Sequence, residues 1–218
     1  YSVGTEVLGI KKPAIMWENT DYGKGLRDML VNDLKAGGIK LLGEASYLPG
    51  TDRDFSAHIT KFKGMGVDGV FLMGNYNASA LFLKQSATFG FKAKFVAGGG
   101  AASAKLIEIA GDASEGFMVV TAYDPNDERA KQKAFSDKYI KTFNEAPNEW
   151  SSHAYDIVYL VKQAIEKGGT DRASLIAKLR EVNYPGVTGD IKFDENGDVP
   201  FKKQFVLKVQ GGRFVTVE

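Results

Sequence analysis

Few residues of this chain have the types and spacing that catalysis needs. The chain has no cysteine, which excludes thiol catalysis, disulfides and thiolate metal sites. His58 and His153 fall in different predicted helices without ligand spacing, so neither favours a metal site. No nucleophile-elbow motif occurs. The run of glycines at 98–100 does not match the dinucleotide fingerprint, because no glycine stands at the third position of its spacing. The sequence therefore implies no cofactor and favours binding over catalysis.

Polar and aromatic residues that follow predicted strands are better candidates for a site. Tyr22 lies in the first turn of a predicted helix, beside backbone N–H groups that have no intrahelical partner. Asn75 and Tyr76 follow the third predicted strand at the same sheet edge. In open parallel sheets, ligands bind outside the carboxyl ends of the strands. Aromatic residues there, without an arranged acid, base or nucleophile, indicate a binding crevice.

Two further motifs permit more than one interpretation. The glycines of 98–100 follow the fourth predicted strand, where they form either a sharp turn or a place for close approach of the backbone to a ligand. The acidic run of 194–198 resembles a calcium loop superficially but lacks the later Glu. Because Asn196-Gly197 between alternating strands is a hairpin signal, we expect a structural turn there.

Composition narrows the class of protein further. The chain has 28 basic and 27 acidic residues without strong clustering, which argues against a nucleic-acid partner or a charge-driven membrane surface. No apolar run approaches the roughly 20 residues of a membrane span. Since the chain starts at Tyr1 and shows no signal peptide, we expect a mature or trimmed protein.

The elements that must position these residues alternate between strand and helix up to residue 123. A buried strand is predicted at 14–17, and the helix after it places Leu26, Met29, Leu30 and Leu34 on one face. Further strands are predicted at 39–47, 67–73, 94–97 and 117–120, with helices between them. This alternation predicts an α/β fold with a doubly wound parallel sheet and right-handed crossovers.

The pattern changes after residue 123. Three amphipathic helices follow without an intervening strand, at about 127–144, 154–165 and 171–179. The second of them is expected to face inward with Ile157, Val158 and Ile165, among others. Strands return at 189–193, 205–209 and 214–217, the last two as a hairpin. The helices could cover the first sheet, or belong to a second lobe whose strands lie outside this sequence.

Four motifs then stand in a recognisable order: 18–25, 54–56, 110–116 and 193–198. With them, essentially the whole chain resembles the branched-chain amino-acid-binding (Leu/Ile/Val-binding) family of type I periplasmic binding proteins, the solute receptors of ABC importers. The resemblance implies two α/β lobes that are joined by three crossovers and close on a ligand by a hinge. It implies no enzyme activity and no cofactor.

The resemblance also implies that this chain is a C-terminal part of a longer protein. Residues 11–123 would form the second α/β lobe, and residues 124–185 would be helices of an incomplete first lobe. Residues 186–218 would be a C-terminal β return to the second lobe, ending in a β-hairpin. The missing N-terminal half, with the strands of the first lobe, is then an expected partner.

Site residues follow from the resemblance position by position. Tyr22 matches an aromatic wall of the ligand cleft, and Tyr76, beside Asn75, matches a second aromatic residue. Gly99 occupies a position that is often acidic in amino-acid-binding members, where the acid pairs with the ammonium of the ligand. Because burying an ammonium without a countercharge is costly, the glycine favours an uncharged or anionic solute such as a carboxylate or aromatic acid.

The expected function is therefore that of a substrate-binding component of an ABC importer. It would capture a small organic solute between two lobes, in the periplasm or outside the cell, and present it to the membrane subunits of the importer. A ligand-sensing domain of a receptor or regulator with the same fold is the alternative. An α/β enzyme acting at the same sheet edge ranks lower, because no plausible catalytic set is present.

Overall fold

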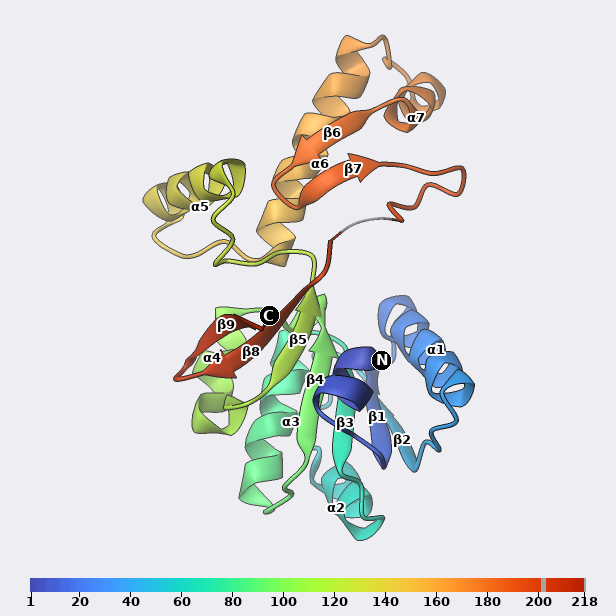
Figure 1. Cartoon of the computed structure of the whole chain (residues 1–218), viewed down its shortest axis with the longest axis vertical. Helices are drawn as coiled ribbons and strands as arrows, with labels where there is room; N and C mark the ends of the chain where they lie inside the picture. The colour runs from blue at the N-terminus through green and yellow to red at the C-terminus, as the bar shows by residue number, and fades with distance from the viewer. Residues whose placement is uncertain (201–202, 218) are drawn as a thin grey trace. The chain divides into compact units, whose positions relative to one another are not determined.

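The protein is described by a computed structural model that covers residues 1–200 and 203–217 (Figure 1). The contacts between residues divide the chain into two compact units. The first unit comprises Tyr1–Thr121 and the residues from Val206 onward, and the second comprises Ala122–Phe205. The chain thus leaves the first unit after residue 121 and returns to it at residue 206.

A seven-stranded sheet in the order β2-β1-β3-β4-β5-β8-β9 forms the centre of the first unit. Neighbouring pairs from β2 to β5 are parallel, whereas β8 and β9 form an antiparallel hairpin. The α/β fold class with a C-terminal hairpin is therefore confirmed. The strands are β1 (Pro13–Glu18), β2 (Gly43–Tyr47), β3 (Gly69–Met73), β4 (Lys94–Gly98), β5 (Met118–Thr121), β8 (Phe205–Gln210) and β9 (Arg213–Val217).

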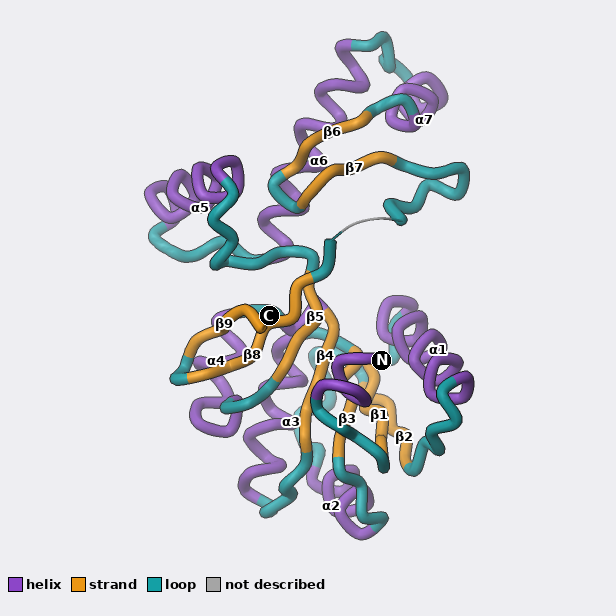
Figure 2. Tube along the Cα trace, in the orientation of Figure 1, coloured by secondary structure: helices purple, strands orange, loops and turns teal. Residues whose placement is uncertain are grey.

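Helices cover both faces of this sheet, as the sequence predicts (Figure 2). Ile15 of β1 and Phe71 of β3 pack with Leu30 of the first helix in one core cluster. The alternate strand residues, such as Met16 and Leu72, point to the opposite face, because side chains alternate along a strand. The helical elements are η1 (Val3–Val7), α1 (Asp21–Ala36), α2 (Ser56–Gly64), α3 (Tyr76–Thr88), η2 (Gly99–Ala101), α4 (Ala104–Ala110) and η3 (Gly111–Ser114).

The helix α1 buries a narrower stripe than the sequence predicts. Leu30 and Leu34 are buried, and Leu26 packs partly against the same core. Met29, in contrast, is 68% exposed. Residues 26, 30 and 34 recur every fourth position, whereas residue 29 lies about 100° away from residue 30 around the helix.

The strand order places a topological switch point between β1 and β3. Strand β1 has β2 on one side and β3 on the other, so the chain crosses the sheet in opposite directions before and after β2. In open α/β sheets of this order, a crevice opens at such a switch point, outside the carboxyl ends of the strands. The segments that follow Glu18 and Met73 lie at that place.

Among its described residues, the second unit contains three helices and a small antiparallel sheet of two strands. Two of these helices have side-chain caps: Asn148 and Asp171 each form a capping box with a serine three residues later. Leu160, Val182, Tyr184 and Ile191 form one of its core clusters. The elements are α5 (Ala130–Phe143), α6 (Glu149–Glu166), α7 (Arg172–Arg180), β6 (Asn183–Gly186) and β7 (Gly189–Lys192).

The expected β return of residues 186–218 differs from the structure. Strand β7 pairs with β6, a strand that the sequence did not predict. Both strands lie in the second unit. The turn at Asn196-Gly197 forms, with the Asp194 N–H donating to the Asp198 carbonyl at 2.9 Å. It is not a hairpin turn, because β7 and β8 belong to different sheets. The contacts place the return at residue 206 rather than at residue 186.

The helix α6 buries a different face from the one that the sequence predicts. Leu160 and Ala164 are 5% and 0% exposed, respectively. Ile157, Val158 and Ile165 are 56%, 65% and 51% exposed, although they were expected to face inward. The helix is apolar on more than one face, and the elements of its own unit cover the face of Leu160.

Candidate functional site

The candidate site lies at the carboxyl ends of β1, β3 and β4. Thr20 begins α1 as its N-cap, and its Oγ1 accepts a hydrogen bond from the Gly23 N–H at 3.2 Å. Asn75 is the N-cap residue of α3 and lies two residues after the end of β3. Both strand-to-helix turns therefore open at the switch point of the sheet.

A buried carboxylate connects these turns. Glu18, the last residue of β1, is 5% exposed. Its Oε2 accepts hydrogen bonds from the Asn75 backbone N–H at 3.2 Å and from the Asn75 Nδ2 at 2.9 Å. The Tyr47 hydroxyl donates to the same oxygen at 3.4 Å, and the Thr20 hydroxyl donates to Oε1 at 3.3 Å. Glu18 thus joins the ends of β1, β2 and β3.

The environment of Tyr47 suppresses its ionisation. Burial raises the pKa of the Tyr47 phenol well above its ordinary value, and the charge of Glu18 raises it further. Tyr47 therefore remains a neutral hydrogen-bond donor to Glu18 at physiological pH. Its ring also packs edge-on against Phe55, with ring centroids 5.6 Å apart.

Because Gly100 has no side chain, three oxygen atoms of other residues lie close to its backbone, just after β4. A Cβ atom at Gly100 would lie 2.9 Å from the Tyr22 hydroxyl oxygen, 2.9 Å from the Asn75 Oδ1 and 3.1 Å from the Gly74 carbonyl oxygen. The first two contacts are closer than real Cβ atoms show, and the third is unusually tight. Glycine at this position therefore allows residues from the β1 and β3 turns to meet beside the β4 turn.

The structure brings some predicted site residues together. Tyr22, 41% exposed, and Asn75 meet at the backbone of Gly100, one residue beyond the predicted Gly99. Gly99 begins the turn η2, and its carbonyl accepts from the Ala102 N–H at 2.9 Å. Tyr76 is the first residue of α3, next to Asn75. Ligand binding by these four residues stays a prediction.

Sequence reasoning did not identify Glu18 or Gly100 as parts of the site. The signal for Glu18 was a carboxylate at the end of an otherwise apolar strand. A charged group so close to the core is seldom buried unless it is paired. The residue that pairs with it, Asn75, is 57 positions away, so the sequence alone did not indicate the pairing.

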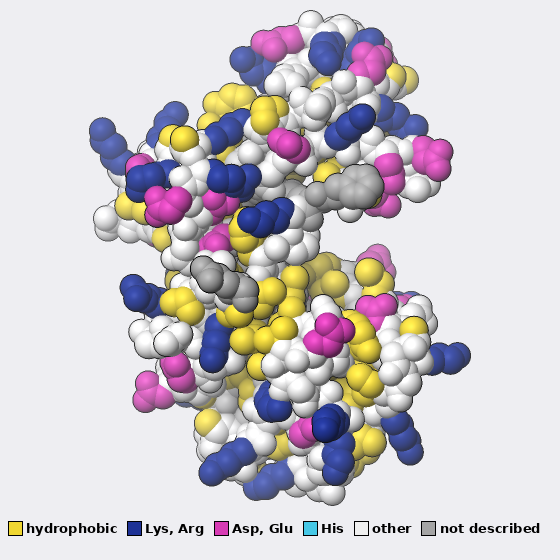
Figure 3. All heavy atoms as spheres, in the orientation of Figure 1, with side chains coloured by type: hydrophobic (Ala, Val, Ile, Leu, Met, Phe, Trp, Pro, Cys, Tyr) yellow, Lys and Arg dark blue, Asp and Glu magenta, His cyan; other side chains and the backbone are white. Residues whose placement is uncertain are grey.

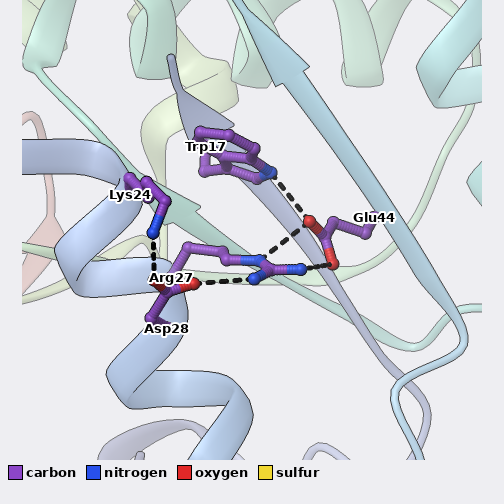
Figure 4. A network of polar contacts seen from close by, with 5 residues as sticks. All are labelled: Trp17, Lys24, Arg27, Asp28 and Glu44. Atoms are coloured by element: carbon purple, nitrogen blue, oxygen red, sulfur yellow. Dashed lines mark hydrogen bonds and ion pairs between the residues drawn. The ribbon is translucent and has the colours of Figure 1, made fainter. Parts of the chain in front are cut away.

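A second polar network holds α1 against the sheet (Figure 4). The Trp17 Nε1–H donates to the Glu44 Oε1 at 3.0 Å, and Arg27 of α1 donates to both oxygens of Glu44 at 2.8 Å. Arg27 and Lys24 also donate to Asp28, at 2.7 and 2.6 Å. Hydrogen bonds to Glu44 and Asp28 raise the pKa of the Arg27 guanidinium. The network fixes the helix that carries Tyr22.

The distribution of charged side chains does not favour a polyanionic partner. Figure 3 shows basic and acidic side chains interspersed over the face in view. Within residues 1–200 and 203–217, no cluster of three or more His, Cys, Asp or Glu residues is arranged to hold a metal ion. In the same part of the chain, no helix has the length and apolar character needed to cross a bilayer.

Comparison with known proteins identifies the family. A family model described as periplasmic binding protein matches residues 3–213. The chain belongs to the periplasmic binding protein family. Leu/Ile/Val-binding protein homolog 1 of Brucella abortus is 34% identical over 206 residues, which cover 92% of this chain and 54% of that protein. These matches confirm the resemblance to branched-chain amino-acid-binding proteins.

A second relative and two solved structures extend this result. The leucine-, isoleucine-, valine-, threonine- and alanine-binding protein of Pseudomonas aeruginosa is 32% identical over 191 residues, 87% of this chain and 50% of that protein. A leucine-binding protein from Thermotoga maritima superposes with a TM-score of 0.88 at 28% identity, covering 100% of this chain and 62% of its own. A benzoate-bound solute-binding protein from R. palustris, at 17% identity and TM-score 0.88, covers 98% of this chain and 59% of its own and shows the shared fold alone. The chain thus spans about half the length of the curated relatives it matches.

Proposed function

We propose that this chain forms part of the substrate-binding component of an ABC importer. The observation that carries the proposal is the meeting of Tyr22, Asn75 and Gly100 at the switch point of an α/β sheet. Family membership and the names of the relatives support it. The rim around Tyr22 would be one wall of a ligand cleft, and the second wall would come from the other lobe. Hinge closure would stabilise the ligand-bound form.

The proposed ligand is a small organic solute, amino-acid-like or a carboxylate or aromatic acid. Relatives are named for binding branched-chain amino acids, which supports the first class. Gly99 provides no countercharge for an ammonium, which supports the second. The rim residues Tyr22, Asn75 and Gly74 do not form a nucleophile with its base, so we propose binding without turnover.

The exposed apolar residues of the second unit support a proposal about its partner. Trp150, Ile157, Val158 and Ile165 of α6 are each more than 50% exposed. Several large exposed apolar side chains on one helix commonly mark an interface. We propose that strands of a first lobe, which lie outside this sequence, cover α6 in the complete receptor.

The proposed setting follows from the same family. The receptor would act in the periplasm or outside the cell and would deliver its solute to the membrane subunits of the importer. Capture and delivery need no cofactor.

A thermal-shift screen tests the function. The chain, alone and with any sequence that its gene adds at either end, is heated with amino acids, short-chain carboxylates and aromatic acids. A true ligand at a hundredfold excess over its dissociation constant stabilises the protein by about 2.7 kcal/mol. Turnover of a stabilising solute would contradict the receptor proposal, and so would the absence of stabilisation by every solute of these classes.

The variant Tyr22→Ala tests the site itself. Removing an aromatic wall weakens binding of a stabilising solute by roughly tenfold or more, whereas Tyr22→Phe retains the ring and serves as the matched control. Unchanged affinity of Tyr22→Ala in calorimetry would remove Tyr22 from the site.

A further inference from the structure

One asparagine of the sequence precedes a glycine, in the pair Asn196-Gly197. In such a pair the glycine nitrogen can attack the asparagine side chain, because the glycine has no Cβ atom that would shield it. The attack forms a bond from the Gly197 nitrogen to the Asn196 Cγ and breaks the bond from Cγ to Nδ2. Ammonia leaves with the proton of the Gly197 N–H, and water then opens the cyclic imide. The products are aspartate and isoaspartate at residue 196.

The structure leaves this pair accessible. Asn196 and Gly197 are both exposed, in the segment between β7 and β8. Gly197 has a φ of 90°, a conformation that residues with a side chain rarely adopt. The pair Asp68-Gly69 is open to the same cyclisation by its sequence, but Gly69 is buried in β3. The Asp68 Oδ1 also accepts a hydrogen bond from the Lys12 N–H at 2.8 Å.

Asp194 holds the turn of residues 194–198, which contains the exposed pair. Its Oδ1 accepts hydrogen bonds from the Asn196 N–H and the Asp198 N–H, both at 2.9 Å. Its carbonyl oxygen accepts from the Gly197 N–H at 3.1 Å. The Gly197 nitrogen has to lose the proton of that hydrogen bond before it can attack. The bonds to Oδ1 hold the backbone on either side of it, so the folded turn opposes the reaction.

We propose that Asn196 is a site of spontaneous deamidation and that Asp194 sets its rate by holding the turn. Each conversion replaces a neutral carboxamide by a carboxylate, close in sequence to Asp194, Glu195 and Asp198. Isoaspartate also adds a methylene group to the main chain. Because like charges in so short a segment repel one another, the product weakens the turn. This segment leads from the second unit back to the first, so the reaction alters that connection as the molecule ages.

Peptide mapping tests the site in the folded protein. Trypsin cleaves after Lys192 and Lys202 and releases residues 193–202, with Asn196 as the only asparagine of the peptide. The protein is kept at mildly alkaline pH, and chromatography with mass spectrometry follows this peptide. We expect two products with the mass of aspartate at residue 196, at a rate that rises with pH because the attacking nitrogen loses a proton. Earlier conversion of another asparagine, or none of Asn196 by the time that guanidinium-unfolded protein has reacted, would overturn the site.

Variants of Asp194 test the control of the rate. Asp194→Ala removes the side-chain acceptor, so we expect deamidation about tenfold faster than in the unaltered protein. Asp194→Asn keeps an oxygen that accepts hydrogen bonds in such turns and should retain the slow rate. Glu195→Ala removes a neighbouring charge, leaves Asp194 in place and serves as the matched control. Equal rates in Asp194→Ala and the unaltered protein, or the same acceleration in Glu195→Ala, would overturn the role of Asp194.

The fold gives a further comparison that needs no variant. Guanidinium removes the turn, so the unfolded protein should react at least as fast as Asp194→Ala. Equal rates in folded and unfolded protein would show that the turn restrains nothing and would overturn the proposal. If Asp194→Ala does not fold, Asp194→Ser takes its place. Its hydroxyl is a weaker acceptor, so its rate should still exceed that of the unaltered protein, and an unchanged rate would overturn the role of Asp194.

Discussion

At the scale of single residues, Gly100 decides how closely the three turns of the site approach one another. The Tyr22 hydroxyl is the end of a partly exposed side chain, which can move outward. The Gly74 carbonyl is backbone that follows a buried strand, which cannot. A side chain at Gly100 would therefore displace Tyr22 first and strain the β3 turn second.

Gly100→Ala should accordingly destabilise the protein and reposition Tyr22. Overpacking of this kind costs about 1–3 kcal/mol, measurable as a lower urea midpoint. The control is Gly25→Ala within α1, where a Cβ would meet nothing within 4 Å. Since alanine is the better helix former, Gly25→Ala should stabilise the protein by about 0.5–1 kcal/mol. Equal midpoints for Gly100→Ala and the unaltered protein would contradict the crowding described here.

The sequence predicted part of this site from the positions of residues after strands. Tyr22 and Asn75 were identified because each follows a recognisable apolar strand. Glu18 was not, because its role depends on a hydrogen bond to a residue 57 positions away. Gly100 was not distinguished from Gly99, because the path of the turn η2, rather than residue type, decides which glycine lies beside Tyr22.

At the scale of elements, Asp156 organises the small sheet of the second unit. This residue of α6 is 1% exposed. It accepts hydrogen bonds from the Val187 N–H at 2.8 Å, the Thr188 N–H at 2.9 Å and the Thr188 hydroxyl at 2.7 Å. These groups form the turn between β6 and β7. The short strand β6 contains Pro185 and Gly186, residue types that are depleted in strands, which explains why the sequence did not predict it.

Asp156→Asn should loosen this turn. The amide keeps one acceptor oxygen where the carboxylate has two, so at least one buried donor loses its partner, at a cost of about 1–3 kcal/mol. Hydrogen exchange at Val187 and Thr188 should accelerate. The control Glu166→Gln removes an exposed charge of the same helix and should change stability by no more than about 0.5 kcal/mol. Unchanged exchange in Asp156→Asn would show that the turn forms without this clamp.

The N-terminus of α7 should respond to pH through Asp171. Hydrogen bonds from Ser174, first from its backbone N–H, lower the pKa of Asp171 below its ordinary value of 3.8. Because the pKa is lower in the folded state, the capping contribution is present above the ordinary pKa and is lost as the pH falls through the folded pKa. Asp171→Ala should therefore destabilise the protein at pH 7, and the difference from the unaltered protein should shrink below about pH 4. A difference that is constant from pH 7 to pH 2 would contradict a charged cap.

At the scale of the whole molecule, the alternation of strands and helices was predictable because apolar runs alternate with segments of helical periodicity, several of which end at glycines such as Gly37 and Gly64. The change of organisation after residue 123 was also visible in the sequence, but the face that α6 buries was not. A helix such as α6, with apolar residues on several faces, does not indicate which face its own chain covers. In the described residues, that choice falls on Leu160 and Ala164, while Ile157 and Val158 remain exposed.

The exposed face of α6 gives a prediction for the chain by itself. Ile157→Lys and Val158→Lys should change its free energy of unfolding by no more than about 0.5 kcal/mol, as surface substitutions do. Leu160→Ala, on the buried face, should cost about 2–5 kcal/mol. Urea denaturation measures both. A loss of several kcal/mol in Val158→Lys would show that this face is already covered within the chain.

The path of the chain through the large sheet has a consequence for protein engineering. Strands β5 and β8 are neighbours, and Val209 exchanges backbone hydrogen bonds with the Gly116 N–H and the Phe117 carbonyl at 2.9 and 2.8 Å. The whole second unit is thus an insert between two adjoining strands. A linker of a few residues from Thr121 to Val206 would excise it and leave a minimal cassette. That cassette would still display the Tyr22 rim and could serve as a graftable recognition module.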